Sequence, residues 1–408
     1  MLHSQARTGL AIDGGQAIRT CPLPEWPRFG EDELSAVAAV LRSGNVNYWT
    51  GEEGKQFERE YAAYCGRRFA LAVANGTVAL ELAVRALGIG EGDEVIVPCR
   101  TFIASASAVA TAGAKPVMAD VDIESQVITA ATIRAAITPR TRAVIVVHLA
   151  GWPCEMDSIL ALADRHGLKV IEDCAQAHGA FFRNRPVGSF GDASAFSFCQ
   201  DKILTTGGEG GMLLVDSEGY WSRAWSYRDH GKSYEAMFAR PYSDGFRWVH
   251  ESFGTNWRMT EMQAAIGRVI LRNLDQQVIR RRENAEYLNS RLVSCPGVRT
   301  TLPPAGIYHS YYKYYFFLRP EALKPGWTRD RVVAAINAEG IPITSGHCGE
   351  IFREKAFDLV GRPDRPLPVA QELFATAVMC QVHPTLDRKD LEDTANAIQK
   401  VLEYAAQT

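Results

Sequence analysis

One lysine in a glycine-rich stretch is the strongest chemical signal in this sequence. Lys202 follows an apolar run at 193–198 and precedes a segment with four glycines between positions 207 and 211. A lysine that is held away from bulk water can lose its proton, attack an aldehyde and then move protons on a substrate carbon. Considered alone, Lys202 would be a solvated surface lysine in a flexible loop, which is the usual role of lysines in glycine-rich stretches. Its role therefore depends on what the fold places beside it.

A carboxylate at the end of a predicted strand is the second candidate. The strand that starts at Val170 ends at Glu172 and Asp173, and open parallel sheets bind their ligands at that edge. A carboxylate there could keep a pyridine ring nitrogen protonated, so that the ring withdraws electrons from a substrate carbanion. A strand-end aspartate is more commonly a helix cap or a metal ligand. Asp173 is nevertheless our candidate for the partner of a cofactor ring.

A strand-to-helix turn supplies a candidate phosphate site. Asn75, Gly76 and Thr77 lie between a predicted strand and a predicted helix. Free backbone N–H groups and a hydroxyl at such a position can bind an anion. The same residues also fit a plain turn in which Thr77 caps the helix, which is the commoner arrangement. Ser197, close to Lys202, is a further candidate for binding phosphate.

These candidates lie in a part of the chain that alternates between strands and helices. Short apolar runs predict strands near 71–74, 94–97, 143–148, 168–171 and 193–198. Segments of helical character lie at 78–87, 103–112 and 156–166. This alternation predicts an α/β fold with a large domain, in which helices cover a mostly parallel sheet.

Beyond residue 260 the pattern changes. A long charged helix at 278–292 would bridge two domains, and an aromatic strand at 311–318 follows it. Further helices are predicted near 329–338, 370–378 and 390–404. We expect an N-terminal arm and a large cofactor-binding domain over residues 1–270. The interdomain helix and a smaller C-terminal α+β domain would then occupy residues 271–408.

Composition argues against several other classes of protein. A formal net charge of −3 gives no basic field for a nucleic-acid backbone. The nine cysteines lack the spacing of zinc or redox motifs, so we expect reduced thiols and no metal. No apolar run approaches the roughly 20 residues that cross a bilayer, and the start of the sequence has no apolar signal core. We expect a soluble, cytoplasmic protein without nucleic-acid or membrane partners.

Four motifs in this order resemble those of the DegT-type sugar aminotransferase family. They are Asn75-Gly-Thr77, Glu172-Asp-Cys-Ala-Gln-Ala-His-Gly-Ala180, Ser197-Phe-Cys-Gln-Asp-Lys202 with its glycine-rich tail, and Asn256-Trp-Arg-Met-Thr-Glu-Met-Gln-Ala-Ala-Ile-Gly267. The resemblance extends from about residue 43 to about residue 403. It implies the aspartate aminotransferase fold with a seven-stranded type of sheet, and a homodimer whose active sites lie at the subunit interface. It also implies pyridoxal 5'-phosphate as cofactor, with pyridoxamine 5'-phosphate as the intermediate form.

The resemblance assigns roles around the cofactor ring. Lys202 would carry the Schiff base, Asp173 would pair with the ring nitrogen, and Gln176 would hydrogen-bond the ring hydroxyl. Phe102 would stack on one face of the ring, and Ala175 would pack on the other. His148 matches a family position near the cofactor, but a buried strand histidine is equally compatible with the sequence, so we leave it out of the catalytic set.

The resemblance also assigns the phosphate and substrate contacts. The phosphate would bind Gly76, Thr77, Ser197 and, from the neighbouring subunit, Asn256. Trp257, Arg258 and His309 are expected near the substrate. The alternative is structural: Arg258 and Glu261 would form a salt-bridged helix start with Thr260 as the cap, and His309 would be a core residue of an alternating strand.

The expected activity is transfer of an amino group from glutamate or glutamine to a nucleotide-linked 3- or 4-keto sugar, for polysaccharide or glycoside biosynthesis. A keto-cyclitol of the scyllo-inosose type is the alternative acceptor. Family members that are sugar dehydratases carry a histidine in place of the lysine, so Lys202 favours transamination. A regulatory protein that binds the cofactor without turnover is a competing class. A nicotinamide enzyme is rejected because 207–211 lacks the GxGxxG turn that opens a helix.

Two segments depart from the family pattern and leave the substrate open. The loop at 345–350 differs from the commoner histidine-tyrosine-proline loop, and the motif at 227–232 is followed by a long aromatic insertion that extends to Phe253.

Overall fold

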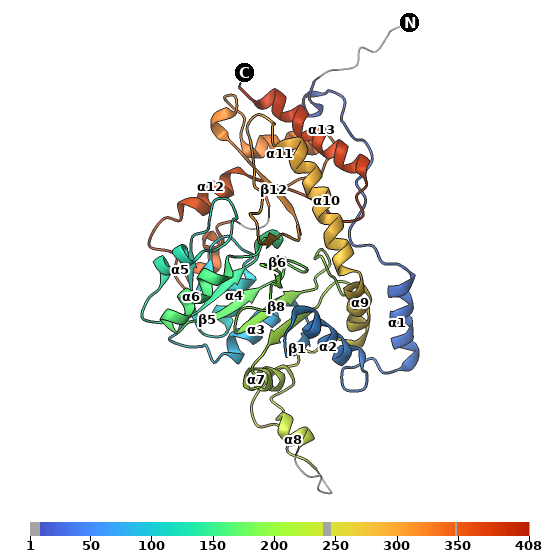
Figure 1. Cartoon of the computed structure of the whole chain (residues 1–408), viewed down its shortest axis with the longest axis vertical. Helices are drawn as coiled ribbons and strands as arrows, with labels where there is room; N and C mark the ends of the chain where they lie inside the picture. The colour runs from blue at the N-terminus through green and yellow to red at the C-terminus, as the bar shows by residue number, and fades with distance from the viewer. Residues whose placement is uncertain (1–8, 240–245, 347–348, 408) are drawn as a thin grey trace.

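The computed structural model describes residues 9–239, 246–346 and 349–407, and a seven-stranded sheet forms its centre (Figure 1). The strand order is β1-β9-β8-β5-β4-β2-β3. The strands are β1 (Phe69–Val73), β2 (Glu94–Pro98), β3 (Lys115–Ala119), β4 (Thr141–Val147), β5 (Lys169–Asp173), β8 (Ala193–Ser197) and β9 (Gly211–Val215). β9 runs antiparallel to β8 and to β1, whereas the other neighbouring pairs are parallel. The predicted α/β fold with a mostly parallel sheet is confirmed.

The central strands are buried on both faces, as expected for parallel strands covered by helices. All five residues of β2 and of β8 are buried, although β2 begins with Glu94 and β8 contains Ser194 and Ser197 among its apolar residues. The sequence did not predict β3 or β9. β3 contains Pro116 and begins with an exposed lysine, features that an edge strand tolerates because one side of it makes no ladder hydrogen bonds.

Helices surround this sheet, and most of them cover its faces (Figure 1). They are α1 (Glu31–Ser43), α2 (Glu53–Cys65), α3 (Gly76–Ala86), α4 (Ala104–Thr111), α5 (Ala130–Ala136), α6 (Met156–His166), α7 (Glu218–Arg228), α8 (Tyr234–Phe238) and α9 (Glu261–Arg272). Thr260 caps α9 and forms a capping box with Gln263. The predicted helix at 156–166 has the bounds of α6, and Gly167 ends it in the left-handed conformation.

A second, antiparallel sheet follows the long helix α10 (Leu274–Leu292). Its order is β10-β12-β13, and its strands are β10 (Val298–Thr300), β12 (Tyr314–Leu318) and β13 (Ala377–Cys380). The helices beside it are α11 (Arg329–Ala338), α12 (Pro368–Thr376) and α13 (Arg388–Ala405), and Figure 1 shows α10 running along α13. The division at residue 270 stays a prediction, and this position lies inside α9.

One predicted helix border in this region was wrong. The helix expected at 370–378 ends at Thr376, and the next four residues form β13, which pairs with β12. All four residues of β13 are buried, and buried backbone N–H and C=O groups need hydrogen-bond partners. Pairing with β12 supplies these partners. A third small sheet joins β11 (Ile307–Tyr308) to the hairpin β6 (Phe181–Phe182) and β7 (Arg185–Pro186).

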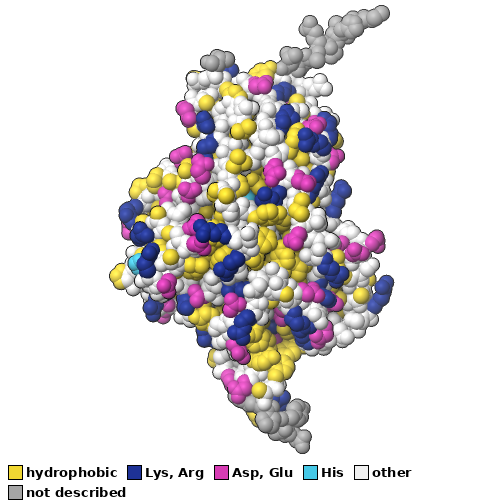
Figure 2. Space-filling model, viewed as in Figure 1, with side chains coloured by type: hydrophobic (Ala, Val, Ile, Leu, Met, Phe, Trp, Pro, Cys, Tyr) yellow, Lys and Arg dark blue, Asp and Glu magenta, His cyan; other side chains and the backbone are white. Residues whose placement is uncertain are grey.

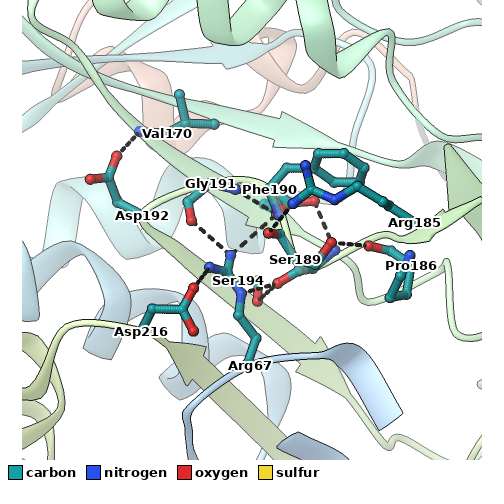
Figure 3. Close-up of polar contacts among 12 residues, drawn as sticks. Arg67, Val170, Arg185, Pro186, Ser189, Phe190, Gly191, Asp192, Ser194 and Asp216 are labelled. Carbon is teal, nitrogen blue, oxygen red and sulfur yellow. Dashed lines mark hydrogen bonds and ion pairs between the residues drawn. The ribbon is translucent and has the colours of Figure 1, made fainter. Parts of the chain in front are cut away.

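A buried arginine, Arg67, links loops at the end of the large sheet where β1 and β8 begin. Figure 3 shows Arg67 between Asp216 and Gly191, to which it donates hydrogen bonds of 2.7 Å each. Its Nε donates to the carbonyl of Gly188 at 2.6 Å. The same turn donates three backbone N–H groups to the buried carboxylate of Glu172. These hydrogen bonds lie at the end of the sheet where β1 and β8 begin. The opposite end of the sheet, where the parallel strands have their carboxyl ends, stays available for a ligand.

Charged side chains of both signs are interspersed over the face of the molecule in Figure 2, and no single sign dominates it. Such a surface is in keeping with the small formal net charge. In the described part of the chain, every helix is too short or too polar to span a membrane.

Candidate active site

A cavity of about 580 Å³ lies at the carboxyl ends of the parallel strands. Eight of the sequence candidates line it: Gly76, Thr77, Phe102, Asp173, Ala175, Gln176, Ser197 and Lys202. They come from loops after four different strands, which the fold brings to one edge of the sheet. Another cavity, of about 620 Å³, lies against the edge strand β3, and none of the candidates lines it.

The start of α3 forms one corner of the cavity. The Asn75 side chain accepts a hydrogen bond from the Val78 N–H at 3.0 Å, so Asn75 caps the helix. The interpretation of Thr77 as the cap was therefore wrong, and Thr77 instead lines the cavity. The first N–H groups of a helix have no partner within the helix, and the helix dipole favours negative charge there.

Gly76 lets this helix approach the end of β8. A Cβ atom at Gly76 would lie 2.5 Å from the Cβ of Ser197, closer than real Cβ contacts come. The absence of a side chain at position 76 therefore places the Ser197 hydroxyl beside the α3 N-terminus. The two phosphate candidates that the sequence separates by more than a hundred residues are neighbours in the fold.

Asp173 ends β5 at the floor of the cavity and is almost fully buried. Its Oδ2 accepts a hydrogen bond from the Ser105 hydroxyl at 2.8 Å, and its Oδ1 accepts one from the Ala175 N–H at 3.1 Å. Burial raises the pKa of Asp173, although both hydrogen bonds act in the opposite direction. A positively charged group in the cavity would therefore stabilise its ionised form. No sequence pattern singles out Ser105, which lies in the first turn of α4.

An aromatic ring and a small residue line other parts of the cavity. Phe102, in the loop before α4, is 57% exposed although the chain buries most of its large apolar side chains. Exposed apolar surface beside a cavity is typical of a binding site. Ala175 and Gln176 follow Asp173, and the Gln176 side-chain oxygen accepts a hydrogen bond from the Ala150 N–H at 2.8 Å.

Lys202 lies in the loop between β8 and β9, and its side chain is 16% exposed. Its Nζ donates a hydrogen bond to the Tyr312 hydroxyl at 3.3 Å and lies 3.5 Å from Oδ1 of Asp201. The backbone carbonyl of Lys202 accepts a hydrogen bond from the Trp26 indole at 3.0 Å. The N-terminal segment thus holds the lysine loop from outside. The interpretation of Lys202 as a solvated surface lysine is wrong.

Sequence reasoning missed three further residues beside Lys202. The Tyr312 hydroxyl donates a short hydrogen bond to Asp201, and the Lys313 Nζ lies 3.7 Å from the same carboxylate. Burial favours the neutral form of Asp201, but Lys202, Tyr312 and Lys313 together lower the pKa of Asp201 below its usual value. The signal was present in the sequence as a lysine inside an aromatic run and an aspartate adjacent to the candidate lysine.

A break in the predicted strand explains how Tyr312 and Lys313 both line the cavity. The sequence predicted a strand over 311–318, in which neighbouring side chains would point to opposite faces. Instead β12 begins at Tyr314, and Tyr311 has a positive φ of 48°. Both side chains therefore line the same cavity.

Four of the sequence candidates do not line this cavity in the described chain. Asn256 is exposed, and the Trp257 carbonyl accepts a hydrogen bond from the Ala74 N–H at 2.8 Å. Arg258 pairs with the buried Asp229 at 2.5 Å. His309 is buried and stacks on Tyr311 with ring centroids 3.8 Å apart. Their proposed contacts with cofactor or substrate stay predictions.

His148 belongs to a buried polar group behind Asp173. Its Nδ1 accepts a hydrogen bond from the Cys154 N–H at 3.0 Å, and its Nε2 lies 3.1 Å from the Glu172 carboxylate. With Glu172 and Cys174 it forms a group whose spacing would allow a metal ion. However, a neutral His148 that accepts at Nδ1 carries its proton on Nε2, so neither ring nitrogen has a lone pair left for a metal.

Comparison with known proteins agrees with this geometry. Residues 27–399 match the model of the DegT/DnrJ/EryC1/StrS aminotransferase family. The chain is 37% identical over 421 residues to the L-glutamine:2-deoxy-scyllo-inosose aminotransferase of Streptoalloteichus tenebrarius, covering 97% of this chain and 98% of the relative. It is 37% identical over 380 residues to the UDP-N-acetyl-3-dehydro-alpha-D-glucosamine 3-aminotransferase of Acidithiobacillus ferrooxidans, covering 91% and 94%.

A solved structure shares the fold as well. The aminotransferase from Psychrobacter cryohalolentis is 47% identical, with a TM-score of 0.91 over 94% of this chain and 100% of that chain. The fold and these relatives define an aminotransferase of the pyridoxal-phosphate-dependent class. The chain belongs to the DegT/DnrJ/EryC1/StrS aminotransferase family. The predicted family, fold and class of enzyme are confirmed.

Proposed function

We propose that this enzyme transfers an amino group from glutamine or glutamate to the ketone of a nucleotide-linked 3- or 4-keto sugar. The observation that carries the proposal is the arrangement of one cavity, where Lys202 and the buried Asp173 lie with the N-terminus of α3. The relative from Acidithiobacillus ferrooxidans, named as an aminotransferase of a UDP-linked 3-dehydro sugar, supports this acceptor class. The product would be an amino sugar for polysaccharide or glycoside biosynthesis.

The residues of the cavity fit pyridoxal 5'-phosphate. The α3 N-terminus with Gly76, Thr77 and Ser197 would bind its phosphate, because a Cβ at Gly76 would close this cradle. Asp173 would pair with the ring nitrogen, since burial raises the pKa of this carboxyl and a positively charged partner would offset that effect. When bound, the cofactor supplies an aldehyde that bonds an amine and a ring that withdraws electrons from the adjacent carbon.

The remaining contacts would orient the cofactor ring. Phe102 would cover one face and Ala175 the other, and Gln176 would hydrogen-bond the ring hydroxyl. Burial of an aromatic face against Phe102 would also exclude water from the reacting atoms. These roles rest on the position of each residue in the cavity lining and on the family resemblance.

Lys202 would hold the cofactor and then transfer protons. Once its Nζ is released by the amino donor, Lys202 would take the proton from the donor's α-carbon and deliver a proton to the carbon on the other side of the donor nitrogen. Tyr312 and Asp201, which contact the Nζ in this structure, would hold it near the reacting atoms. In the second half-reaction, with the ketone, Lys202 would move protons in the opposite direction.

We also propose a homodimer with shared active sites. Asn256 would reach the phosphate of the neighbouring subunit, which is compatible with its exposure and its distance from the cavity of its own chain. Trp257, Arg258 and His309 remain proposed substrate contacts. A cytoplasmic location is proposed because the described cysteines are all free thiols, as expected in a reducing compartment.

A keto-cyclitol is the second candidate acceptor. It is favoured by the 37% identity to the 2-deoxy-scyllo-inosose aminotransferase over nearly the full length of both chains. The two acceptors differ in charge, because a free cyclitol lacks the diphosphate of a sugar nucleotide. The loops that would distinguish them include residues 240–245 and 347–348, which lie outside the described residues.

The first experiment is an absorption spectrum of the protein with pyridoxal 5'-phosphate, before and after addition of glutamine or glutamate. We expect the band of the lysine-bound cofactor to convert to that of the pyridoxamine form, with release of the keto acid. UDP- and dTDP-linked keto hexoses and scyllo-inosose derivatives would then be tested for restoring the original band. A spectrum that neither donor changes would contradict the proposal and favour a cofactor-binding regulatory protein.

A further inference from the structure

Two ammonium groups share one carboxylate on the wall of the cavity. The Nζ of Lys202 lies 3.5 Å from Oδ1 of Asp201, and the Nζ of Lys313 lies 3.7 Å from Oδ2. Each Nζ also lies 4.8 Å from the ring centroid of Tyr312. The two cations thus lie beside the same carboxylate and the same aromatic ring. The proposed function commits Lys202 to the cofactor and assigns nothing to Lys313.

The environment of Lys313 leaves its charge incompletely compensated. Its side chain is only 14% exposed, and burial lowers the pKa of Lys313, which the nearby Asp201 partly offsets. An ammonium has three N–H donors, and its distance to Asp201 exceeds the roughly 3.2 Å limit of a good hydrogen bond. An anion entering the cavity would therefore gain a charge-assisted hydrogen bond and would stabilise the protonated form.

The position of Lys313 decides which anion fits. The nitrogen of the amino donor must reach the carbon that Lys202 bonds, and the donor's α-carboxylate is only two bonds from that nitrogen. Its cationic partner must then lie within a few ångströms of the Lys202 Nζ. Among the described residues that line the cavity, Lys202 and Lys313 are the only cationic side chains. The diphosphate of a sugar nucleotide is attached to the anomeric carbon, several bonds from a ketone at carbon 3 or 4.

We propose that Lys313 binds the α-carboxylate of the amino donor, with Asp201 and Tyr312 holding the ammonium in place. This inference rests on the proposed function, because it names the subsite for the first substrate of that reaction. Lys313 is adjacent to Tyr312 and enters the cavity because β12 begins one residue later. In the absence of donor, Asp201 balances only part of the charge of the two ammonium groups.

The test separates the two half-reactions. The holoenzyme and its Lys313→Met variant are mixed with glutamine or glutamate, and the rate of conversion to the pyridoxamine form is followed against donor concentration. We expect the variant to need about 10- to 100-fold more donor for half-saturation, as loss of a hydrogen bond between charged groups implies. The reaction of the preformed pyridoxamine enzyme with a keto acceptor should keep its half-saturation concentration.

A binding measurement without turnover accompanies the kinetics. Glutarate, an unreactive dicarboxylate, is titrated into the holoenzyme by calorimetry, and Lys313→Met should weaken its binding while Lys313→Arg retains most of it. Lys355→Met, at an exposed lysine outside the cavity lining, is the matched control and should change neither measurement. The cofactor absorption and the thermal unfolding of each variant establish that the fold persists. If Lys313→Met does not fold, the charge-retaining Lys313→Arg and a neutral Lys313→Gln variant provide the comparison.

Three outcomes would overturn the inference. Unchanged donor half-saturation and unchanged glutarate binding in Lys313→Met would show that the carboxylate binds elsewhere. An effect confined to the keto acceptor would assign Lys313 to the second substrate. If the wild-type holoenzyme itself showed no donor-driven spectral change, the proposed function would fail together with the subsite, and this outcome is visible before any variant is made.

Discussion

Two side chains from different strand ends carry the proposed chemistry of the cavity. Asp173 is held by the Ser105 hydroxyl and the Ala175 N–H, and Lys202 is held by Tyr312 and Asp201. Each group is fixed by one partner close to it in the sequence, Ala175 or Asp201, and by one distant partner, Ser105 or Tyr312. Fixed positions matter because a proton-transfer group acts only within hydrogen-bond reach of its target atom.

Replacement of Lys202 by alanine should abolish both cofactor attachment and transamination. The lysine is the proposed bond to the cofactor and the proposed acid-base group, so we expect the rate to fall by at least ~10²- to 10⁴-fold. Borohydride reduction followed by mass spectrometry would locate the attachment site in the wild type and find none in Lys202→Ala. The assignment of Lys202 would be wrong if the variant retained the label and normal turnover.

Replacement of Asp173 by asparagine should lower the rate while leaving the cofactor attached. The amide cannot hold a protonated ring nitrogen, and loss of one such electrostatic contact costs on the order of 10²- to 10³-fold. Single-turnover rates with glutamine would measure this loss. Ser105→Ala, which removes only a hydrogen bond to the same carboxylate, should have a smaller effect. Equal rates for Asp173→Asn and the wild type would show that another group protonates the ring.

At the scale of elements, the residues at which one helix and one strand begin decide the shape of the site. α3 begins at Gly76, and β12 begins late, after the positive φ of Tyr311. The first feature brings Ser197 beside the helix N-terminus, and the second brings Tyr312 and Lys313 into one cavity. Backbone conformation at single residues thereby sets which side chains meet.

Gly76→Ala should weaken cofactor binding and destabilise the protein. The new Cβ would lie 2.5 Å from the Cβ of Ser197, so either α3 or the end of β8 must shift. We expect a loss of about 1–3 kcal/mol in the free energy of unfolding, as for other overpacked sites, together with weaker phosphate binding. Urea unfolding and fluorescence titration with pyridoxal 5'-phosphate would measure the two effects. Gly219→Ala in α7 is the control, because its nearest neighbour would be 3.7 Å away. Wild-type cofactor affinity in Gly76→Ala would contradict the proposed cradle.

At the scale of the whole molecule, buried histidines make stability depend on pH. Burial lowers the pKa of His178, His309 and His383 to about 3 each, from an ordinary value of 6.5. At a pH between about 3 and 6.5, these histidines therefore bind more protons in the unfolded chain than in the folded chain. Their contribution to stability is present above pH 6.5 and is lost as the pH falls toward 3.

We expect acid to lower the free energy of unfolding of the cofactor-free protein, and we expect His178 to account for a measurable part of this loss. This residue lies between the Tyr61 hydroxyl and the Ser197 carbonyl and is fully buried, so its folded form is neutral. Well below pH 6.5, where the unfolded histidine is protonated, each such histidine adds up to about 1.4 kcal/mol per pH unit to the slope of unfolding free energy against pH. Urea unfolding at pH 6, 5 and 4 should give a slope that is smaller by about this amount in His178→Gln. An unchanged slope would mean that His178 is protonated or exposed in the folded protein.

The sequence by itself determined the class of the sheet and eight of the residues that line the cavity. Alternating apolar runs and helices predict the parallel sheet, because strands buried on both faces must be apolar throughout. The carboxyl ends of parallel strands share one edge, so Asp173, Gly76 and Lys202 could be expected together. The edge strand β3 and the strand β13 escaped detection, since a proline and a preceding helical pattern obscured them.

Only the tertiary structure decided what surrounds these residues. Asn75 rather than Thr77 caps α3, Ser105 supports Asp173, and Trp26 holds the backbone of Lys202. Tyr312 and Lys313 join the cavity because the chain breaks the alternation that their sequence predicted. The physical reason is the same in each case. Local sequence determines the periodicity of an element, whereas contacts between distant segments depend on where elements begin and end, and packing of the whole chain sets those positions.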